Sequence, residues 1–440
     1  KTPNLDRLAR EGVRFENAYT NNPVCTPSRM SFLSSLYPST HGYYGLYGHE
    51  PAEPMTNLFE RFARAGYRTG ALGKLHTPRY WVERRCQFVY DEFVEYPKYL
   101  EGAGLYEEND SRGFVKGRGD GPSPIPLEHS CEMALAKQTV RFIRHEGEPR
   151  DRTGERTPWV GWICFSRPHQ PWTPSEPFAS MYDPDAIAMP PTAETETNPY
   201  VIEARQKHDE TRCRKLTAAY LGLCSQVDHA VGAILDELER TGDLDDTIVV
   251  YTADHGDYAG EHGLNEKGHG ISYRAIARVP LIVRMPGGAR GGRVTEEIVE
   301  AVDVFPTLCE LAGVEPPRTV QGRSFAGMVT GENTEPIRED ALTENCFRKA
   351  LATKRWRYVA NIEGERDELY DVESDPWELN NRIDDPACKP VADRMLRRLL
   401  DRVVRARRHV TGIGGQWHDH PYDEDGRIDI ERMGGPPRYW

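Results

Sequence analysis

The sequence has no apolar run long enough to cross a membrane. A membrane helix needs about 20 consecutive apolar residues, and the mean hydropathy of the chain is -0.67. The chain also lacks an excess of positive charge, because its formal net charge is -13. That balance argues against nucleic acid as the main partner, whereas a local basic pocket could still bind a small anion. We therefore expect a soluble protein with no membrane span and no nucleic-acid partner.

Paired cysteine motifs are missing as well. None of the nine cysteines forms a C-x-x-C pair, so a zinc knuckle is not expected, and most read as small buried hydrophobes. No signal peptide is recognisable, which leaves the cytoplasm, the periplasm and secretion all open. The sequence opens at Lys1-Thr2-Pro3-Asn4 without a first strand, and we expect roughly one strand and loop upstream.

Helices alternate with buried strands over about three quarters of the chain. The expected strands are 13–19, 67–72, 159–165, 247–252 and 280–285, and the expected helices are 3–11, 56–66, 133–143, 209–240 and 303–312. This order predicts an α/β domain over residues 1–330, with a large, mostly parallel sheet covered by helices on both faces. Ligands of such sheets bind beyond the C-terminal ends of the strands.

The character of the sequence changes after about residue 330. Short strands are expected at 350–353 and 358–361, followed by a helix near 390–408. We predict a smaller α+β domain over residues 331–440, which ends in an irregular tail from Gly412.

The first candidate cluster is Cys25-Thr26-Pro27-Ser28-Arg29. Pro27 can start a helix just after Cys25, and a helix N-terminus favours an anion and lowers a thiol pKa. Arg29 lies one turn on and could point back to Cys25. An isolated run of this kind is equally compatible with a buried structural cysteine.

Two further clusters follow predicted strands. Lys74 and His76 come after strand 67–72, and their alternate positions point the same way in an extended segment. His169 follows strand 159–165 between two prolines that stiffen its loop. These groups suit binding and protonating an oxyanion, although a surface lysine, a structural histidine and a proline-rich turn are the simpler alternatives.

The fourth cluster gives the strongest signal. Asp254 and His255 come directly after strand 247–252 and are followed by glycines and Lys267. A carboxylate beside an imidazole is a ligand pair for a hard or borderline cation, and glycine lets the backbone turn tightly around it. The alternative is a polar loop that caps the next helix.

Taken together, these clusters resemble the sulfatase family of the alkaline phosphatase superfamily. The matching runs are C-T-P-S-R, G-K-L-H, P-H-Q-P and D-H-G-D, in that order, with supporting similarity at 2–9, 37–42, 279–283 and 369–381. The similarity spans nearly the whole chain. Asp254-His255, with a lysine thirteen residues after Asp254, resembles the branch that contains iduronate and choline sulfatases and phosphonate monoester hydrolases.

The resemblance implies a mechanism and its residues. Cys25 would be oxidised to formylglycine by a formylglycine-generating enzyme, and Ca²⁺ (alternatively Mn²⁺ or Mg²⁺) would be held by Cys25, Asp254 and His255. The other implied roles are orientation of the hydrated aldehyde by Arg29, sulfate binding by Lys74 and Lys267, base catalysis by His76 and protonation of the leaving alcohol by His169. The substrate would be a sulfate ester of a small molecule or an oligosaccharide.

The sequence departs from the family pattern in two places. The family's adjacent Asp-Asp metal ligands precede a segment like Thr2–Ala9 and are not in this sequence, and Leu33-Ser34-Ser35 stands where the family usually has Leu-Thr-Gly. Two alternatives remain. The shared branch leaves open a phosphonate or phosphate ester hydrolase, and the missing Asp pair leaves open a catalytically dead protein that binds sulfated glycans. Aromatic side chains that would suit a sugar or aryl ring are Tyr43, Tyr44, Tyr47, His49 and Trp172. An oligomer is possible.

Overall fold

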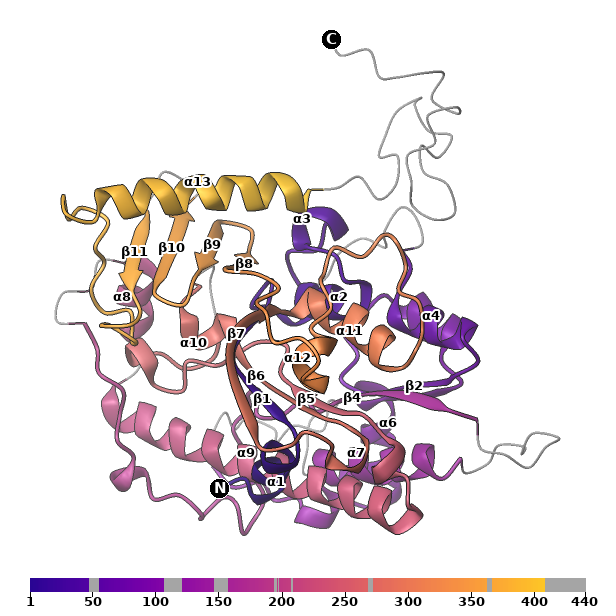
Figure 1. The fold of residues 1–440 in the computed structure, drawn as a ribbon. Coiled ribbons are helices and arrows are strands. Elements are labelled where there is room, and N and C mark those ends of the chain that lie inside the picture. The colour runs from indigo at the N-terminus through magenta and orange to yellow at the C-terminus, as the bar shows by residue number, and fades with distance from the viewer. Residues whose placement is uncertain are drawn as a thin grey trace, which may run out of the picture.

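The computed structural model describes residues 1–46, 55–106, 121–145, 157–193, 196, 198–206, 209–267, 272–361 and 366–407. Tyr47, His49 and the tail from Gly412 lie outside these ranges. A larger body of sheets and helices adjoins a smaller C-terminal sheet (Figure 1). None of the described helices has the length and apolar content that a bilayer span requires.

The larger body contains two sheets. One has the strand order β5-β6-β1-β7, and the other has the order β3-β2-β4. Their bounds are β1 Val13–Tyr19, β2 Arg68–Gly73, β3 Phe88–Asp91, β4 Trp159–Cys164, β5 Val249–Thr252, β6 Arg278–Arg284 and β7 Arg293–Glu300. The pairings of β2 with β3 and β4 are parallel, as is that of β1 with β7.

The predicted α/β class is confirmed, with one strand reversed. β6 runs antiparallel to both β1 and β5. The sequence does not reveal this reversal, because it depends on how the chain returns after β5. In its described residues, the connection from β5 to β6 carries the Asp254–Lys267 loop and no long crossover helix. β6 therefore starts near the end of β5 and runs back beside it.

Helices cover both faces of the sheets (Figure 1). On one side, α1 (Pro3–Glu11), α7 (Cys131–Ile143) and α9 (Glu210–Thr241) supply an apolar cluster that packs against β6. On the other, α2 (Cys25–Ser34), α11 (Val304–Leu311) and α12 (Ala326–Thr330) pack against β1, β6 and β7. α9 has the predicted limits, because the Asp209 carboxylate caps its first turn and Gly242 ends it with a φ of 76°.

The C-terminal sheet is antiparallel, with the order β11-β10-β9-β8. Its strands are β8 Ala341–Glu344, β9 Arg348–Ala352, β10 Trp356–Asn361 and β11 Glu368–Asp371. Helix α13 (Lys389–Ala406) lies along the outer side of this sheet (Figure 1). Two of the strands and the helix match the sequence-based expectation, whereas β8 and β11 were not predicted. The domain boundary near residue 330 stays a prediction.

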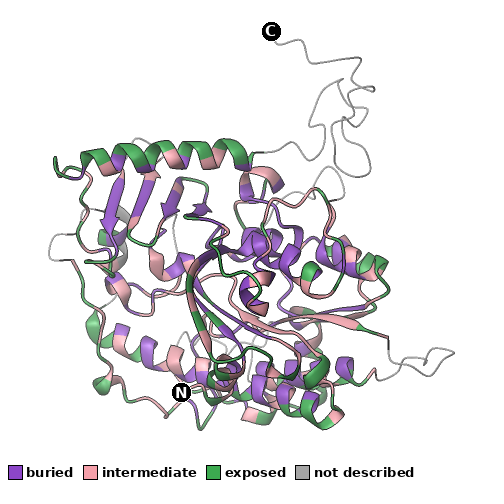
Figure 2. Cartoon of the chain, in the orientation of Figure 1, coloured by how far each residue is buried: buried purple, intermediate pink, exposed green. Residues whose placement is uncertain are grey.

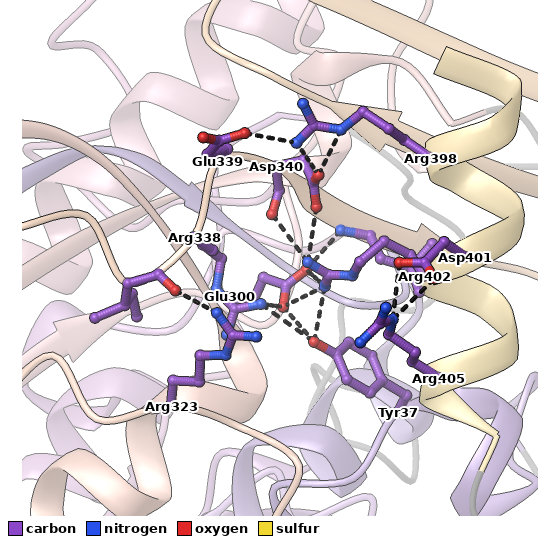
Figure 3. A network of polar contacts seen from close by, with 12 residues as sticks. Tyr37, Glu300, Arg323, Arg338, Glu339, Asp340, Arg398, Asp401, Arg402 and Arg405 are labelled. Atoms are coloured by element: carbon purple, nitrogen blue, oxygen red, sulfur yellow. Dashed lines mark hydrogen bonds and ion pairs between the residues drawn. The ribbon is translucent and has the colours of Figure 1, made fainter. Parts of the chain in front are cut away.

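A buried ionic network joins α13 to the larger body (Figure 3). Its centre is Glu300, at the end of β7, which accepts hydrogen bonds from Tyr37, Arg338 and Arg402. Arg338 also pairs with Asp303. Burial alone would raise the pKa of the Glu300 carboxyl, but Arg338 and Arg402 hold it below its ordinary value. Glu300 is therefore charged, and both guanidinium groups are needed to compensate it.

Replacing Arg338 with methionine should lower the free energy of unfolding by about 3–5 kcal/mol, because two buried carboxylates lose a partner. The side chains of Arg338, Glu300 and Asp303 are 3%, 0% and 0% exposed. Arg405→Met is the matched control, since Arg405 and its partner Asp401 are 76% and 56% exposed. Chemical denaturation should show a much smaller loss for this control, and equal losses would contradict the prediction.

Candidate active site

Cys25 lies at the start of a buried helix. β1 ends at Tyr19, and α2 begins at Cys25, as the sequence predicted. The cysteine is 1% exposed. Ser28, one turn on, donates a hydrogen bond of 2.6 Å from its hydroxyl to the carbonyl of Asp254. This bond fixes the first turn of α2 against the loop that follows β5.

Arg29 joins the ends of three strands. Its Nε and Nη2 atoms each lie 2.9 Å from Oδ2 of Asp254, and its Nη1 donates to the carbonyl of Lys74. Burial would raise the pKa of Asp254, but the nearby cations, Arg29 first among them, hold it well below its ordinary range. Arg29 thus hydrogen-bonds to Asp254 and Lys74, whereas the sequence suggested that it could point back to Cys25.

His255 presents one ring nitrogen to Cys25. Its Nδ1 donates to the carbonyl of Gly256 at 2.8 Å, and its Nε2 lies 3.2 Å from Sγ of Cys25. One ligand atom each from Cys25, Asp254 and His255 lies within 4.8 Å of the others. A carboxylate, an imidazole nitrogen with its tautomer fixed, and the group at position 25 form a donor set that fits a divalent cation.

The Cys25 thiol is electrostatically perturbed. Burial and the negative charge of Asp254 both raise its pKa, whereas hydrogen bonding to His255 and His76 lowers it. The lowering effects dominate, and the pKa of Cys25 falls well below its ordinary value. An anionic group at position 25 is therefore stabilised by its surroundings.

His169 and Lys267 form a hydrogen-bonded pair. Nδ1 of His169 donates to the carbonyl of Gln170 at 2.9 Å, and Nζ of Lys267 donates to Nε2 of the same ring at 2.8 Å. Burial, with the charges of Lys74 and Lys267, lowers the pKa of His169 to about 3. The imidazole is therefore neutral near pH 7, and its Nε2 accepts the hydrogen bond from Lys267.

Lys74 and His76 complete the set. Lys74 is 5% exposed, and its charge acts on both Asp254 and His169. His76 stacks on Phe93 at 5.5 Å between ring centroids, and its buried Nδ1 has no hydrogen-bond partner among the described residues. The structure thus brings together all eight predicted site residues: Cys25, Arg29, Lys74, His76, His169, Asp254, His255 and Lys267.

Arg167 is a site-supporting residue to which the sequence reading gave no role. Its Nη1 donates to the carbonyls of His169, at 3.1 Å, and Pro171, at 2.6 Å. Its Nε lies 3.7 Å from the buried carboxylate of Glu132. Arg167 therefore holds the loop that carries His169. The sequence shows an arginine two residues before His169, but it does not show that this side chain is buried or which groups it contacts.

Two of the three aromatic candidates within the described residues lie in the core. Tyr43 and Trp172 are each 5% exposed and pack in hydrophobic clusters. Tyr44 packs against Lys349, whose Nζ lies 4.5 Å from the ring centroid. The structure therefore gives Tyr43 and Trp172 a packing role.

A cavity of about 780 Å³ reaches from this site into the body of the protein. It lies between β4 and β5, and it is also lined by apolar side chains of α9 and α11. Within the described chain, β4 pairs only with β2, and β5 pairs only with β6. Both strands thus turn a free edge toward the same cavity, whose polar end contains Arg29, Lys74, His169, Asp254, His255 and Lys267.

The depressed pKa of His169 predicts a pH dependence of stability. The unfolded chain takes up a proton near pH 6.5, whereas the folded chain excludes it until about pH 3. The contribution of neutral His169 to the free energy of unfolding is therefore fully present above pH 6.5, and it is lost as the pH falls toward 3. His169→Gln should flatten the fall in unfolding free energy between these limits by about 1.4 kcal/mol per pH unit.

Denaturation series across the acid range would measure this slope. Lys267→Met removes one of the charges that lower the pKa of His169. The pKa of His169 in the folded chain should therefore rise, and the pH range over which stability falls should end at a higher pH. An unchanged slope in His169→Gln would contradict the prediction.

Comparisons with known proteins agree with this geometry. A family model described as Sulfatase matches residues 1–314, and one described as N-sulphoglucosamine sulphohydrolase, C-terminal, matches residues 260–405. An arylsulfatase from Clostridium perfringens is 27% identical over 92% of this chain and 90% of its own length. A choline-sulfatase from Rhizobium meliloti is 31% identical over 87% of this chain and 78% of its own length.

Solved structures share the fold. That of a phosphonate monoester hydrolase from Silicibacter pomeroyi aligns with a TM-score of 0.79 at 24% identity and covers 96% of this chain and 95% of its own. The Sulfatase model spans more than half of the sequence, and the choline-sulfatase exceeds 30% identity across most of it. The chain belongs to the sulfatase family of the alkaline phosphatase superfamily, and both relatives named above are sulfatases.

Proposed function

We propose that this chain hydrolyses sulfate esters with a nucleophile made from Cys25. The supporting observation is that Cys25, Asp254 and His255 meet beside Lys74 and Lys267 at the ends of the strands. Cations placed where an oxyanion gains charge are the main catalytic resource in group transfer. Family membership implies a formylglycine and a divalent metal, and the donor set at this site fits both.

Cys25 is the residue proposed to become formylglycine, through the action of a formylglycine-generating enzyme. Once hydrated, this group supplies one hydroxyl to attack sulfur and a second that permits release of sulfate. His76 is proposed as the base at this position. Its Nδ1 is buried without a hydrogen-bond partner in the described chain, while the ring lowers the pKa of Cys25. Arg29 positions the site through Asp254.

Asp254 and His255 are proposed to hold the metal together with the group at position 25. Ca²⁺ is the preferred ion, with Mn²⁺ and Mg²⁺ as alternatives, and it would acidify a coordinated hydroxyl. Ca²⁺ takes 6–8 oxygen ligands, more than these three residues supply. We propose that further carboxylates come from an additional strand that fills the cavity between β4 and β5. Both of these strands have a free edge there in the described chain, and the cavity reaches Asp254.

Lys74 and Lys267 are proposed to bind the sulfate oxygens, and the Lys267–His169 pair to protonate the leaving alcohol. Nζ of Lys267 donates to Nε2 of His169 at 2.8 Å, so the two groups can act together. Arg167 keeps this ring in place by holding two carbonyls of its loop. Because His169 is neutral near pH 7, the positive charge that faces the sulfate would come from Lys74 and Lys267 and not from the imidazole ring.

The relatives suggest a substrate class. One is named an arylsulfatase and another a choline-sulfatase, so we propose a sulfate ester of a small molecule or a carbohydrate. Phosphonate ester hydrolysis is the second candidate, because the fold is shared with a phosphonate monoester hydrolase. A phosphonate monoester also presents an anionic, tetrahedral centre to the same lysines.

Metal binding should be measurable without activity. Ca²⁺ at about 100 times its dissociation constant should stabilise the protein by about 2.7 kcal/mol, and a chelator should reverse this. Asp254→Asn and His255→Gln should abolish the shift in thermal unfolding, whereas His129→Gln, outside the site, should keep it. A shift that persists in both site variants would contradict the assignment, and parallel titrations with Mn²⁺ and Mg²⁺ would identify the preferred ion.

A substrate panel tests the reaction class. We expect kcat/KM to be higher on an aryl sulfate than on the matching phosphonate or phosphate monoester, and Cys25→Ala to lower it by about 10⁴-fold or more. Faster turnover of phosphonate would favour the second candidate. Glycan binding without turnover would favour a non-catalytic protein. Mass spectrometry of the tryptic peptide 15–29 from active protein should show an aldehyde or its hydrate, and an unmodified cysteine there would refute the nucleophile.

A further inference from the structure

The C-terminal helix α13 exposes an aliphatic stripe on its outer face. Leu396, Leu400 and Val404 are 45%, 62% and 64% exposed and lie four residues apart, so they share one side of the helix. An adjacent side, with Met395 and Leu399, packs on the C-terminal sheet. The outward face of α13 is exposed along most of its length (Figure 2). The stripe is thus additional to the residues that attach α13 to the sheet.

Charged residues form a second row beside the stripe. Asp393, Arg397, Asp401 and Arg405 recur every four residues and are all exposed. The row alternates in sign from one end of the helix to the other. Within the helix, Asp401 pairs with Arg405 at 2.8 Å and Asp393 with Lys389 at 3.1 Å. Both are solvent-exposed pairs of low energetic value. These charges therefore remain available to a partner.

The alternation makes the face complementary to an inverted copy of itself. If two α13 helices pack antiparallel about Leu399, Arg397 of one lies opposite Asp401 of the other, and Asp393 lies opposite Arg405. Leu400 then interleaves with its own copy, and Leu396 with Val404, at a stagger of about 3 Å along the helix axis. In a parallel twofold pair the two charged rows would lie on opposite sides of the contact and would not meet. Of these two arrangements, the antiparallel one buries the aliphatic row and also pairs the charged one.

We propose that α13 is a self-association surface, through which two copies of this chain form a twofold dimer with their C-terminal helices antiparallel. Such a contact is isologous, because the same patch serves both subunits. A helix of 18 residues is about 27 Å long. A single helix pair of that length is a small interface, so the dimer should dissociate at concentrations of the order of micromolar. The contact is independent of the proposed chemistry.

Sedimentation of the full chain at about 1 to 200 μM would test the proposal, since this range brackets the expected dissociation constant. We expect a reversible monomer–dimer equilibrium. Val404→Glu should weaken it about tenfold or more, because two carboxylates enter an apolar contact. Val94→Glu is the matched control, since Val94 is 47% exposed on α6 (Glu92–Gly102), and it should leave the equilibrium unchanged.

The antiparallel register has its own test. Arg397→Asp should weaken the dimer, because it places two aspartates together at each end of the contact. The double variant Arg397→Asp with Asp401→Arg should restore it. Circular dichroism would confirm that each variant is folded. A chain that stays monomeric throughout, as when its own tail covers the stripe, overturns the proposal. The proposal is also overturned if Val404→Glu leaves the dimer unchanged, or if the double variant does not restore it.

Discussion

The buried ion pair between Arg29 and Asp254 is the contact on which the geometry of the site depends. One guanidinium group holds the carboxylate that follows β5 and the carbonyl of Lys74, which follows β2. Because Arg29 is one turn from Cys25 on α2, the same contact also fixes the nucleophile position. Removing either partner would leave an uncompensated charge in the interior. Three segments far apart in the sequence are thereby held in one arrangement.

Much of this site was predictable because its residues follow buried strands. The strands before Lys74, His169 and Asp254 were recognised from short apolar runs, and ligand sites lie beyond such strand ends in α/β proteins. The reversal of β6 and the partners of Arg29 were not predictable. Both depend on the path of the chain through space, which no local pattern of residues encodes.

The C-terminal part shows the same limit. Helix α13 was predicted from its periodicity, but β8 and β11 are only four residues long and buried throughout, so they lack the alternation that identifies a strand. Glu300 is simply an acidic residue in the sequence. Its central role in the junction emerges only when Arg338 and Arg402 approach it from separate elements. Fold class is encoded locally, whereas charge compensation is not.

The burial of Cys25 sets an order of events in the life of the protein. At 1% exposure, its sulfur is out of reach of any enzyme that would have to bind the surrounding chain. The proposed modification of Cys25 would therefore have to occur before α2 packs against the loop after β5. A molecule that folds first would keep its thiol and would lack the proposed nucleophile.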